Sequence, residues 1–166
     1  PAAPVLFIKP DSAILPKEQD FFIPEFSDNV HYEMELLVKI RKVGKHISKA
    51  FAHRYYDEVS VGIDFTARDL QEELKSRGLP WEKAKGFDGA TVIGDFIPKT
   101  EFKSVDNIDF HLDKNGEPQF DIISDVAYDY IEFITKYHSN LINAALFMYF
   151  ESLIQSSEAS DKTFHA

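Results

Sequence analysis

The sequence predicts a mostly β domain with some helix, and two alternating stretches and one helix signal carry this prediction. Residues 32–40 and 59–66 alternate apolar and polar side chains, which is the period of two expected of a strand. At the end of the second stretch, Thr66 and Asp69 have the spacing of a helix N-cap and its third residue, and Gly78 can end that helix. We therefore expect a buried strand that runs straight into a helix at the centre of the chain.

The remaining elements are expected in chain order. A short helix is expected within residues 48–57, a strand at 91–98, and a hairpin that starts at 107–113 and turns at Asn115-Gly116. Beyond residue 120 the pattern favours helix. In 141–154 apolar residues cover every face of the expected helix, so this helix should be buried or bound to something.

A chain of 166 residues is expected to form one domain. We expect it to have three parts, which are a core, a helical C-terminal segment and a polar tail that frays. These parts correspond to residues 1–120, 121–155 and 156–166.

The composition excludes several classes of function. The net charge of −10 argues against a nucleic-acid partner, which requires a basic surface. The chain contains no cysteine, which excludes disulfides and thiolate chemistry. It shows no signal-peptide pattern and no uncharged apolar run long enough to span a membrane. We therefore expect a cytoplasmic protein that binds neither nucleic acid nor membrane.

Three acidic residues on the two expected strands indicate a metal site. Glu33 and Glu35 are two residues apart, so both side chains project from the same face of their strand. Like charges side by side repel each other, and a divalent cation would remove this repulsion. Asp64 stands on the polar face of an apolar strand, where a carboxylate is costly to bury unless it is paired or binds a metal. Three carboxylates suit Mg²⁺, Mn²⁺ or Ca²⁺ rather than zinc.

Five runs of sequence resemble the fumarylacetoacetate hydrolase family, most closely its small single-domain members. The runs follow the family's order, and together they are far more specific than Glu-x-Glu alone. They are Val5–Ile14, His31–Leu36, Gly62–Gln71, Lys85–Asp88 and Asn115–Glu117. The resemblance covers roughly residues 4–120 and implies that this core is catalytic. It also implies a mixed, rolled β-sandwich, to which 141–154 would add an extra C-terminal helix.

The resemblance implies roles for the metal site and for one lysine. Glu33, Glu35 and Asp64 match the family's metal ligands, with Mg²⁺ or Mn²⁺ as the expected ion. Lys85 matches the family's active-site lysine. A cation at this position would stabilise the negative charge that develops on a 2-oxo acid.

Other residues of the matched runs have weaker implied roles. Arg68 and Gln71 match positions that orient the substrate. Arg68 could clamp a substrate carboxylate, or it could pair with a neighbouring acid and support the metal ligands. Lys9 and Ser12 match a segment near the family's active site, although packing and a turn would explain them equally well.

The activity that the resemblance implies is metal-dependent chemistry on small 2-oxo (di)acids such as acylpyruvates or oxaloacetate. The metal would bind the 2-oxo oxygen and carboxylate and act as a Lewis acid on an enolate. Such an enolate leads to C–C bond hydrolysis, decarboxylation or keto–enol isomerisation. The family habit also implies a homodimer.

The sequence departs from the family pattern in two places. Relatives carry an Asn-Tyr-x-x-His segment before the first matched run, and its His activates water. They also carry a Gly-rich loop after residue 120, whereas no Gly or Pro follows Pro118 here. Two interpretations stay open, besides a purely structural domain. The chain is a fragment or altered form of an enzyme, or it is an incomplete, inactive paralogue that binds a metal, a ligand or a partner.

Overall fold

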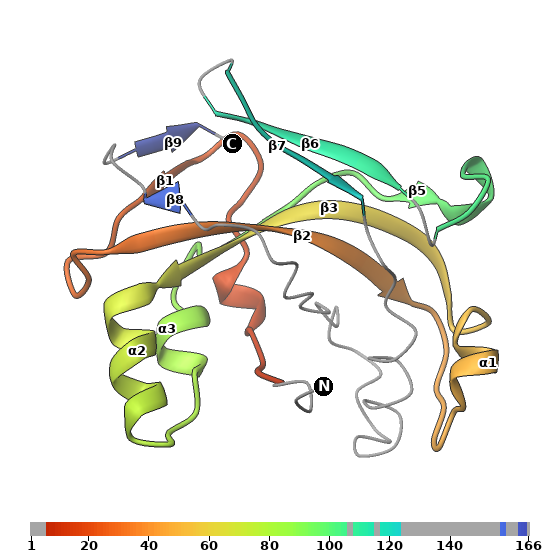
Figure 1. The fold of residues 1–166 in the computed structure, drawn as a ribbon, viewed down its shortest axis with the longest axis horizontal. Coiled ribbons are helices and arrows are strands. Elements are labelled where there is room, and N and C mark those ends of the chain that lie inside the picture. The colour runs from red at the N-terminus through yellow and green to blue at the C-terminus, as the bar shows by residue number, and fades with distance from the viewer. Residues whose placement is uncertain (1–5, 106–107, 115–116, 124–156, 159–162, 166) are drawn as a thin grey trace. The chain divides into compact units, whose positions relative to one another are not determined.

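The structure is a computed structural model that describes residues 6–105, 108–114, 117–123, 157–158 and 163–165. Its strands are β1 (Asp20–Phe22), β2 (Val30–Ile40), β3 (Tyr56–Ala67), β4 (Thr91–Ile93), β5 (Ile97–Pro98), β6 (Asp109–Lys114), β7 (Glu117–Ile123), β8 (Ser157–Glu158) and β9 (Thr163–His165). Its α-helices are α1 (Lys49–Ala52), α2 (Arg68–Ser76) and α3 (Glu82–Lys85) (Figure 1). None of these described helices is long and apolar enough to cross a membrane.

Two long strands, β2 and β3, are neighbours in a sheet of order β4-β3-β2-β8. The second half of β3 pairs antiparallel with β4, with Ile63 opposite Val92, and its first half pairs antiparallel with β5. A separate hairpin joins β6 and β7. The described part of the chain is therefore mixed β and α, with antiparallel sheet pairing. The rolled sandwich stays a prediction.

The chain separates into two compact units. The first comprises Pro1–Glu35, Gly62–Gly94 and Leu153–Ala166. The second comprises Leu36–Val61 and Asp95–Ser152. All six residues for which the sequence predicts a site lie in the first unit.

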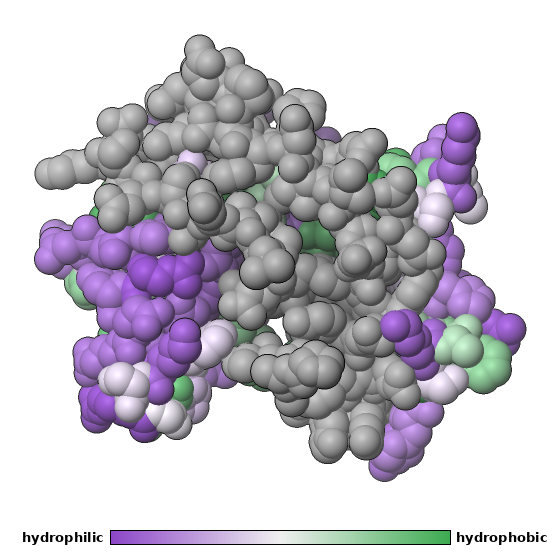
Figure 2. Space-filling view, in the orientation of Figure 1, coloured by the Kyte–Doolittle hydropathy of each residue, from purple (hydrophilic) through white to green (hydrophobic). Residues whose placement is uncertain are grey.

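Helices α2 and α3 lie side by side in the first unit (Figure 1). Small and apolar side chains are buried between them and fix α3, whose last residue is Lys85. The opposite face of α2 is exposed and hydrophilic (Figure 2). The helix therefore has the amphipathic pattern of a surface helix. The cluster consists of Ala67, Leu74 and Ala84, with Leu70, Trp81 and Phe87 packed against it.

The junction of β3 and α2 differs from the expected one. The strand continues to Ala67, the helix begins at Arg68, and the N-cap residue, Ala67, makes no side-chain capping hydrogen bond. The expected N-cap at Thr66 is therefore wrong. The hydroxyl of Thr66 accepts a hydrogen bond from Lys85, and the carboxylate of Asp69 binds a neighbouring segment. Both side chains are engaged by partners distant in sequence, which override the local capping pattern.

The end of α2 is as expected. Gly78 has a φ of +64°, a left-handed conformation that favours glycine. The N–H of Gly78 donates to the carbonyl oxygen of Lys75 at 3.1 Å. The N–H of Leu79 donates to the carbonyl oxygen of Leu74 at 2.9 Å. These two bonds form a Schellman motif, which satisfies carbonyl groups at the helix end.

The other expected elements have mixed outcomes. The short helix is α1, the strand expected at 91–98 is divided into β4 and β5, and the hairpin is β6–β7. The helix expected at 141–154 lies outside the described residues. The polar tail is expected to fray. Two described pieces of it form strands that pair with others, β8 with β2 and β9 with β1 (Figure 1).

Candidate functional site

Lys85 is the centre of the candidate site. Its side chain is fully buried, and its Nζ donates to three oxygens at 2.6–2.8 Å. These are Glu33 Oε2 on β2 and, on β3, Asp64 Oδ2 and Thr66 Oγ1. An ammonium group has three N–H donors, so the three acceptors satisfy it. Two carboxylates from different strands therefore converge on one buried cation.

Arg68 binds the other oxygen of Glu33. Its Nη2 donates to Glu33 Oε1, and its Nη1 donates to Gln71 Oε1, one helical turn further along α2. Gln71 is itself buried. Arg68 therefore pairs with a neighbouring acid in the structure, which is one of the two roles predicted for it. Each oxygen of Glu33 thus accepts from a cationic side chain.

Lys9 contacts the other oxygen of Asp64. Its Nζ lies 2.5 Å from Asp64 Oδ1 and donates to the carbonyl oxygen of Ala90 at 2.8 Å. The Lys9 side chain is only 3% exposed. Burial lowers the pKa of Lys9 below its usual 10.5, because it disfavours the charged form more than Asp64 favours it.

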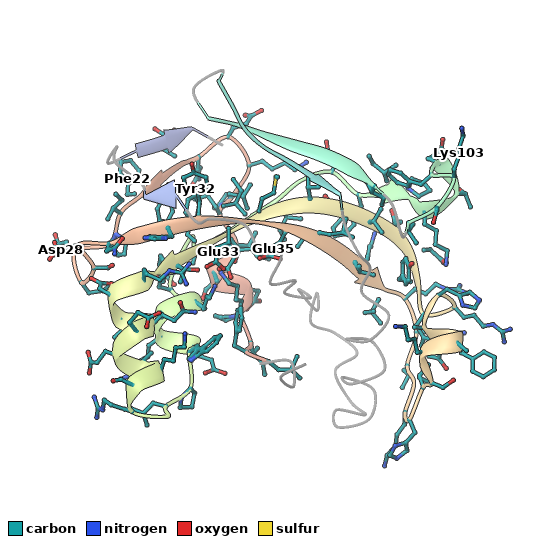
Figure 3. All side chains as sticks on the ribbon, viewed as in Figure 1. Phe22, Asp28, Tyr32, Glu33, Glu35 and Lys103 are labelled. Carbon is teal, nitrogen blue, oxygen red and sulfur yellow. The ribbon has the colours of Figure 1, made fainter. Side chains whose placement is uncertain are left out.

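Glu35 completes the acidic set on the same side of β2 as Glu33 (Figure 3). Its side chain is buried, as expected for an inward-facing position two residues further along the strand. The site therefore holds three acids and three bases, and its formal charge is zero when all six are ionised. The acids are Glu33, Glu35 and Asp64, and the bases are Lys9, Arg68 and Lys85.

The carboxylates of the site have the chemistry of a divalent-metal site, but other groups of the chain engage them. Within the part of the chain that the structure describes, no three His, Asp or Glu side chains are arranged to hold a metal as they stand. Two of the expected ligands, Glu33 and Asp64, already share one cation, Lys85. Asp64 Oδ1 is buried and, despite its ion pair, accepts no well-aligned hydrogen bond. Hard, buried carboxylate oxygens of this kind fit Mg²⁺ or Mn²⁺ chemically.

Asp69 holds the segment that leads into β2 against the start of α2. Its carboxylate accepts hydrogen bonds from Ser27 Oγ at 2.6 Å and from the N–H groups of Asp28 and Leu70. Partial burial alone would raise the pKa of Asp69, but these hydrogen bonds outweigh it and lower that pKa below its usual 3.8. Next to it, the N–H of Arg68 donates to the carbonyl oxygen of Asn29 at 2.8 Å.

The sequence assigned no specific role to two of these residues. The resemblance places Lys9 near the site without a role, and the local spacing favours Thr66 as a helix cap. One signal for Lys9 was available, since it is the one charged residue between Val5 and Pro10. A lysine in such an apolar run needs a buried partner or an exit to solvent.

The sequence model of the fumarylacetoacetate (FAA) hydrolase C-terminal family matches residues 1–142. The chain belongs to the fumarylacetoacetate hydrolase family. The resemblance of the five runs is thereby confirmed.

Curated relatives include mitochondrial oxaloacetate tautomerase from Bos taurus, 38% identical over 117 residues. Oxaloacetate tautomerase YcgM from Escherichia coli is 38% identical over 118 residues. Each alignment covers 70% of this chain. The chain spans 53% of the bovine relative's length and 54% of the bacterial one's.

Solved structures support the same fold. Fumarylpyruvate hydrolase from Pseudomonas aeruginosa, in complex with Mn²⁺ and pyruvate, is 28% identical and superimposes with a TM-score of 0.71. The superposition covers 79% of this chain and 60% of the hydrolase. The antiparallel core described above is therefore similar to that of the family's C-terminal domain.

Proposed function

We propose that this chain belongs to an enzyme that interconverts the keto and enol forms of small 2-oxo (di)acids such as oxaloacetate, with a divalent metal. One observation carries the proposal, namely that Glu33 and Asp64 converge on a buried cation, Lys85. The names of the curated relatives support keto–enol isomerisation in preference to hydrolysis or decarboxylation. The Mn²⁺ and pyruvate in a structural relative support the metal and the substrate class.

The expected ligands of the metal are Glu33, Glu35 and Asp64. When bound, Mg²⁺ or Mn²⁺ would supply Lewis-acid polarisation of the 2-oxo group. The site is neutral without it, so a divalent ion would leave two positive charges uncompensated. A dianionic 2-oxo diacid would balance that excess.

The remaining residues would bind and orient the substrate. Lys85 would exchange one of its present acceptors for a substrate oxygen and hold the negative charge that develops there. Arg68 and Gln71, which already contact each other, would present donors to a substrate carboxylate. In this arrangement the isomerisation needs a group that takes the proton from C3 and a group that gives a proton to the 2-oxo oxygen, but no attacking water.

Three further features are proposed, two from the family and the third from the composition. They are the rolled sandwich, the homodimer and the cytoplasmic location. Mitochondrial and bacterial proteins both occur among the relatives, so membership of the family fits more than one location.

Calorimetry with Mn²⁺ tests the proposal. We expect the chain to bind Mn²⁺, Glu33→Gln to abolish this binding, and oxalate, an enolate mimic, to bind only when Mn²⁺ is present. Glu58→Gln is the matched control, because Glu58 is an acid on β3 in the second unit. A metal-loaded protein should then accelerate deuterium exchange at C3 of oxaloacetate. A folded chain that binds no Mn²⁺ would contradict the proposal.

The second candidate is an inactive member of the family that binds a small acid or a partner. It is favoured by the arrangement of the acids, because no three His, Asp or Glu side chains of the described residues are placed to hold a metal as they stand. Oxalate binding without Mn²⁺, and without exchange of oxaloacetate protons, would support this candidate over the enzyme.

A further inference from the structure

We infer that Lys9 is a positioning residue that fixes the orientation of Asp64 for cation binding. This inference rests on the proposed function, in which Asp64 is a metal ligand. A carboxylate on a strand can rotate about its χ2 bond, and the direction of its two oxygens decides whether it can ligate. Lys9 contacts Oδ1 at 2.5 Å, while Oδ2 accepts from Lys85 at 2.8 Å. The two contacts together define one orientation of the carboxylate plane.

The backbone around Lys9 is held on both sides. Gly86 follows Lys85, and a Cβ on Gly86 would lie 3.2 Å from Pro10 Cδ and 3.5 Å from the carbonyl oxygen of Ile8. The glycine therefore lets the segment that carries Lys9 pass close to the turn after α3. Further along, the N–H of Leu15 donates to the carbonyl oxygen of Thr91 at 2.7 Å.

The second contact of Lys9 ties it to the strand that carries Asp64. The carbonyl oxygen of Ala90 accepts from Lys9 Nζ at 2.8 Å and from the N–H of Phe65 at 2.9 Å. Lys9 is thus paired with Asp64, and it also binds the carbonyl oxygen that accepts from Phe65, the next residue of β3. An ammonium held by a backbone carbonyl cannot follow the carboxylate if it rotates, which is what a positioning role requires.

A purely structural ion pair would have different consequences. It would stabilise the fold, but its loss would leave the cation affinity of a folded variant unchanged. Groups that bind a metal ligand without contacting the metal usually affect metal affinity by about 10- to 100-fold. Metal affinity therefore separates the two roles.

The test uses Mn²⁺ calorimetry on folded protein, checked by circular dichroism. We expect Lys9→Met, which keeps the length of the side chain, to weaken Mn²⁺ binding by about 10- to 100-fold. Lys83→Met, an exposed lysine on α3, is the control and should bind as the wild type does. If Lys9→Met does not fold, Lys9→Gln is measured in its place. Gln keeps a hydrogen-bond donor, so the loss of Mn²⁺ affinity should be smaller. Unchanged or tighter binding by the folded variant would overturn the inference.

A double-mutant cycle on metal-free protein separates this inference from the proposed function. In denaturant unfolding, Lys9→Met should lower the midpoint in the wild type and have little further effect in Asp64→Asn, because Lys9 acts through Asp64. Equal effects in both backgrounds would overturn the inference. Absence of Mn²⁺ binding by the wild type would overturn the proposed function, while the cycle still decides whether Lys9 and Asp64 are coupled.

Discussion

Two sets of ion pairs involve acids on the long strands, one set in each unit. Their N–O distances are similar, but the side chains of one set are buried and those of the other are exposed. In the first unit, Lys85 lies 2.8 Å from Asp64, and their side chains are 0% and 7% exposed. In the second unit, Lys39 lies 2.5 Å from Glu58, and their side chains are 54% and 33% exposed. Distance therefore does not distinguish the two sets.

Exposure to solvent does distinguish them. Water screens an exposed pair, which typically contributes about 0–1 kcal/mol to stability. Removing one partner of a buried pair leaves an uncompensated charge and typically costs about 3–5 kcal/mol. The buried carboxylates also keep a strong attraction for cations, because little solvent screens them. The comparison predicts a graded series of mutational effects.

The largest effect is expected for Lys85→Met. The substitution leaves Glu33 and Asp64 without the cation they share, and we expect the free energy of unfolding to fall by about 3–5 kcal/mol. Urea denaturation at neutral pH measures this change. Lys83→Met, two residues earlier on α3 and exposed, serves as the control. A loss of less than 1 kcal/mol would mean that burial does not govern the difference between the two sets.

A smaller effect is expected for Gly86→Ala. A Cβ at this position would lie 2.9 Å from the carbonyl oxygen of Glu82 and 3.2 Å from Pro10, so backbone must shift. We expect a loss of about 1–3 kcal/mol in urea denaturation. Lys83→Ala, at an exposed position of the same helix end, provides the control. Unchanged stability of Gly86→Ala would contradict the close approach of the Lys9 segment.

Asp69→Asn tests hydrogen bonds at the surface of the first unit. Asn keeps the shape but weakens the bonds from Ser27 and two N–H groups, and we expect a loss of about 1 kcal/mol at pH 7. The pKa of Asp69 is lowered in the folded state, so its contribution is complete above 3.8. It disappears as the pH falls through the lower folded-state value. Stability curves of wild type and variant should therefore converge in acid, and a constant difference would contradict this assignment.

The smallest effect is expected for Lys39→Met, which removes the exposed pair with Glu58. We expect a loss below about 1 kcal/mol in low salt, and a smaller loss in 1 M NaCl because salt screens exposed charges. Denaturation of Lys85→Met in the same two buffers sharpens the comparison. The loss of unfolding free energy in this variant should depend less on salt, because the pair it removes is buried. Equal salt dependence of the two variants would argue against it.

Much of the scaffold of the site could be predicted from the sequence. The alternation of 32–40 and 59–66 predicted β2 and most of β3, and Gly78 marked the end of α2. Glu33 and Glu35 were expected on one face, and both point to the same side of β2. These features depend on backbone geometry within a few residues, which the local pattern specifies.

The tertiary structure decided the start of α2 and the partners of the acids. Thr66 and Asp69 have the spacing of a helix cap, but one binds Lys85 and the other binds Ser27. No spacing in the chain indicates that Lys9 meets Asp64 or that Lys85 binds acids on two strands. A buried charge takes whichever opposite charge the fold brings near, because leaving it unpaired costs more than any local hydrogen bond returns.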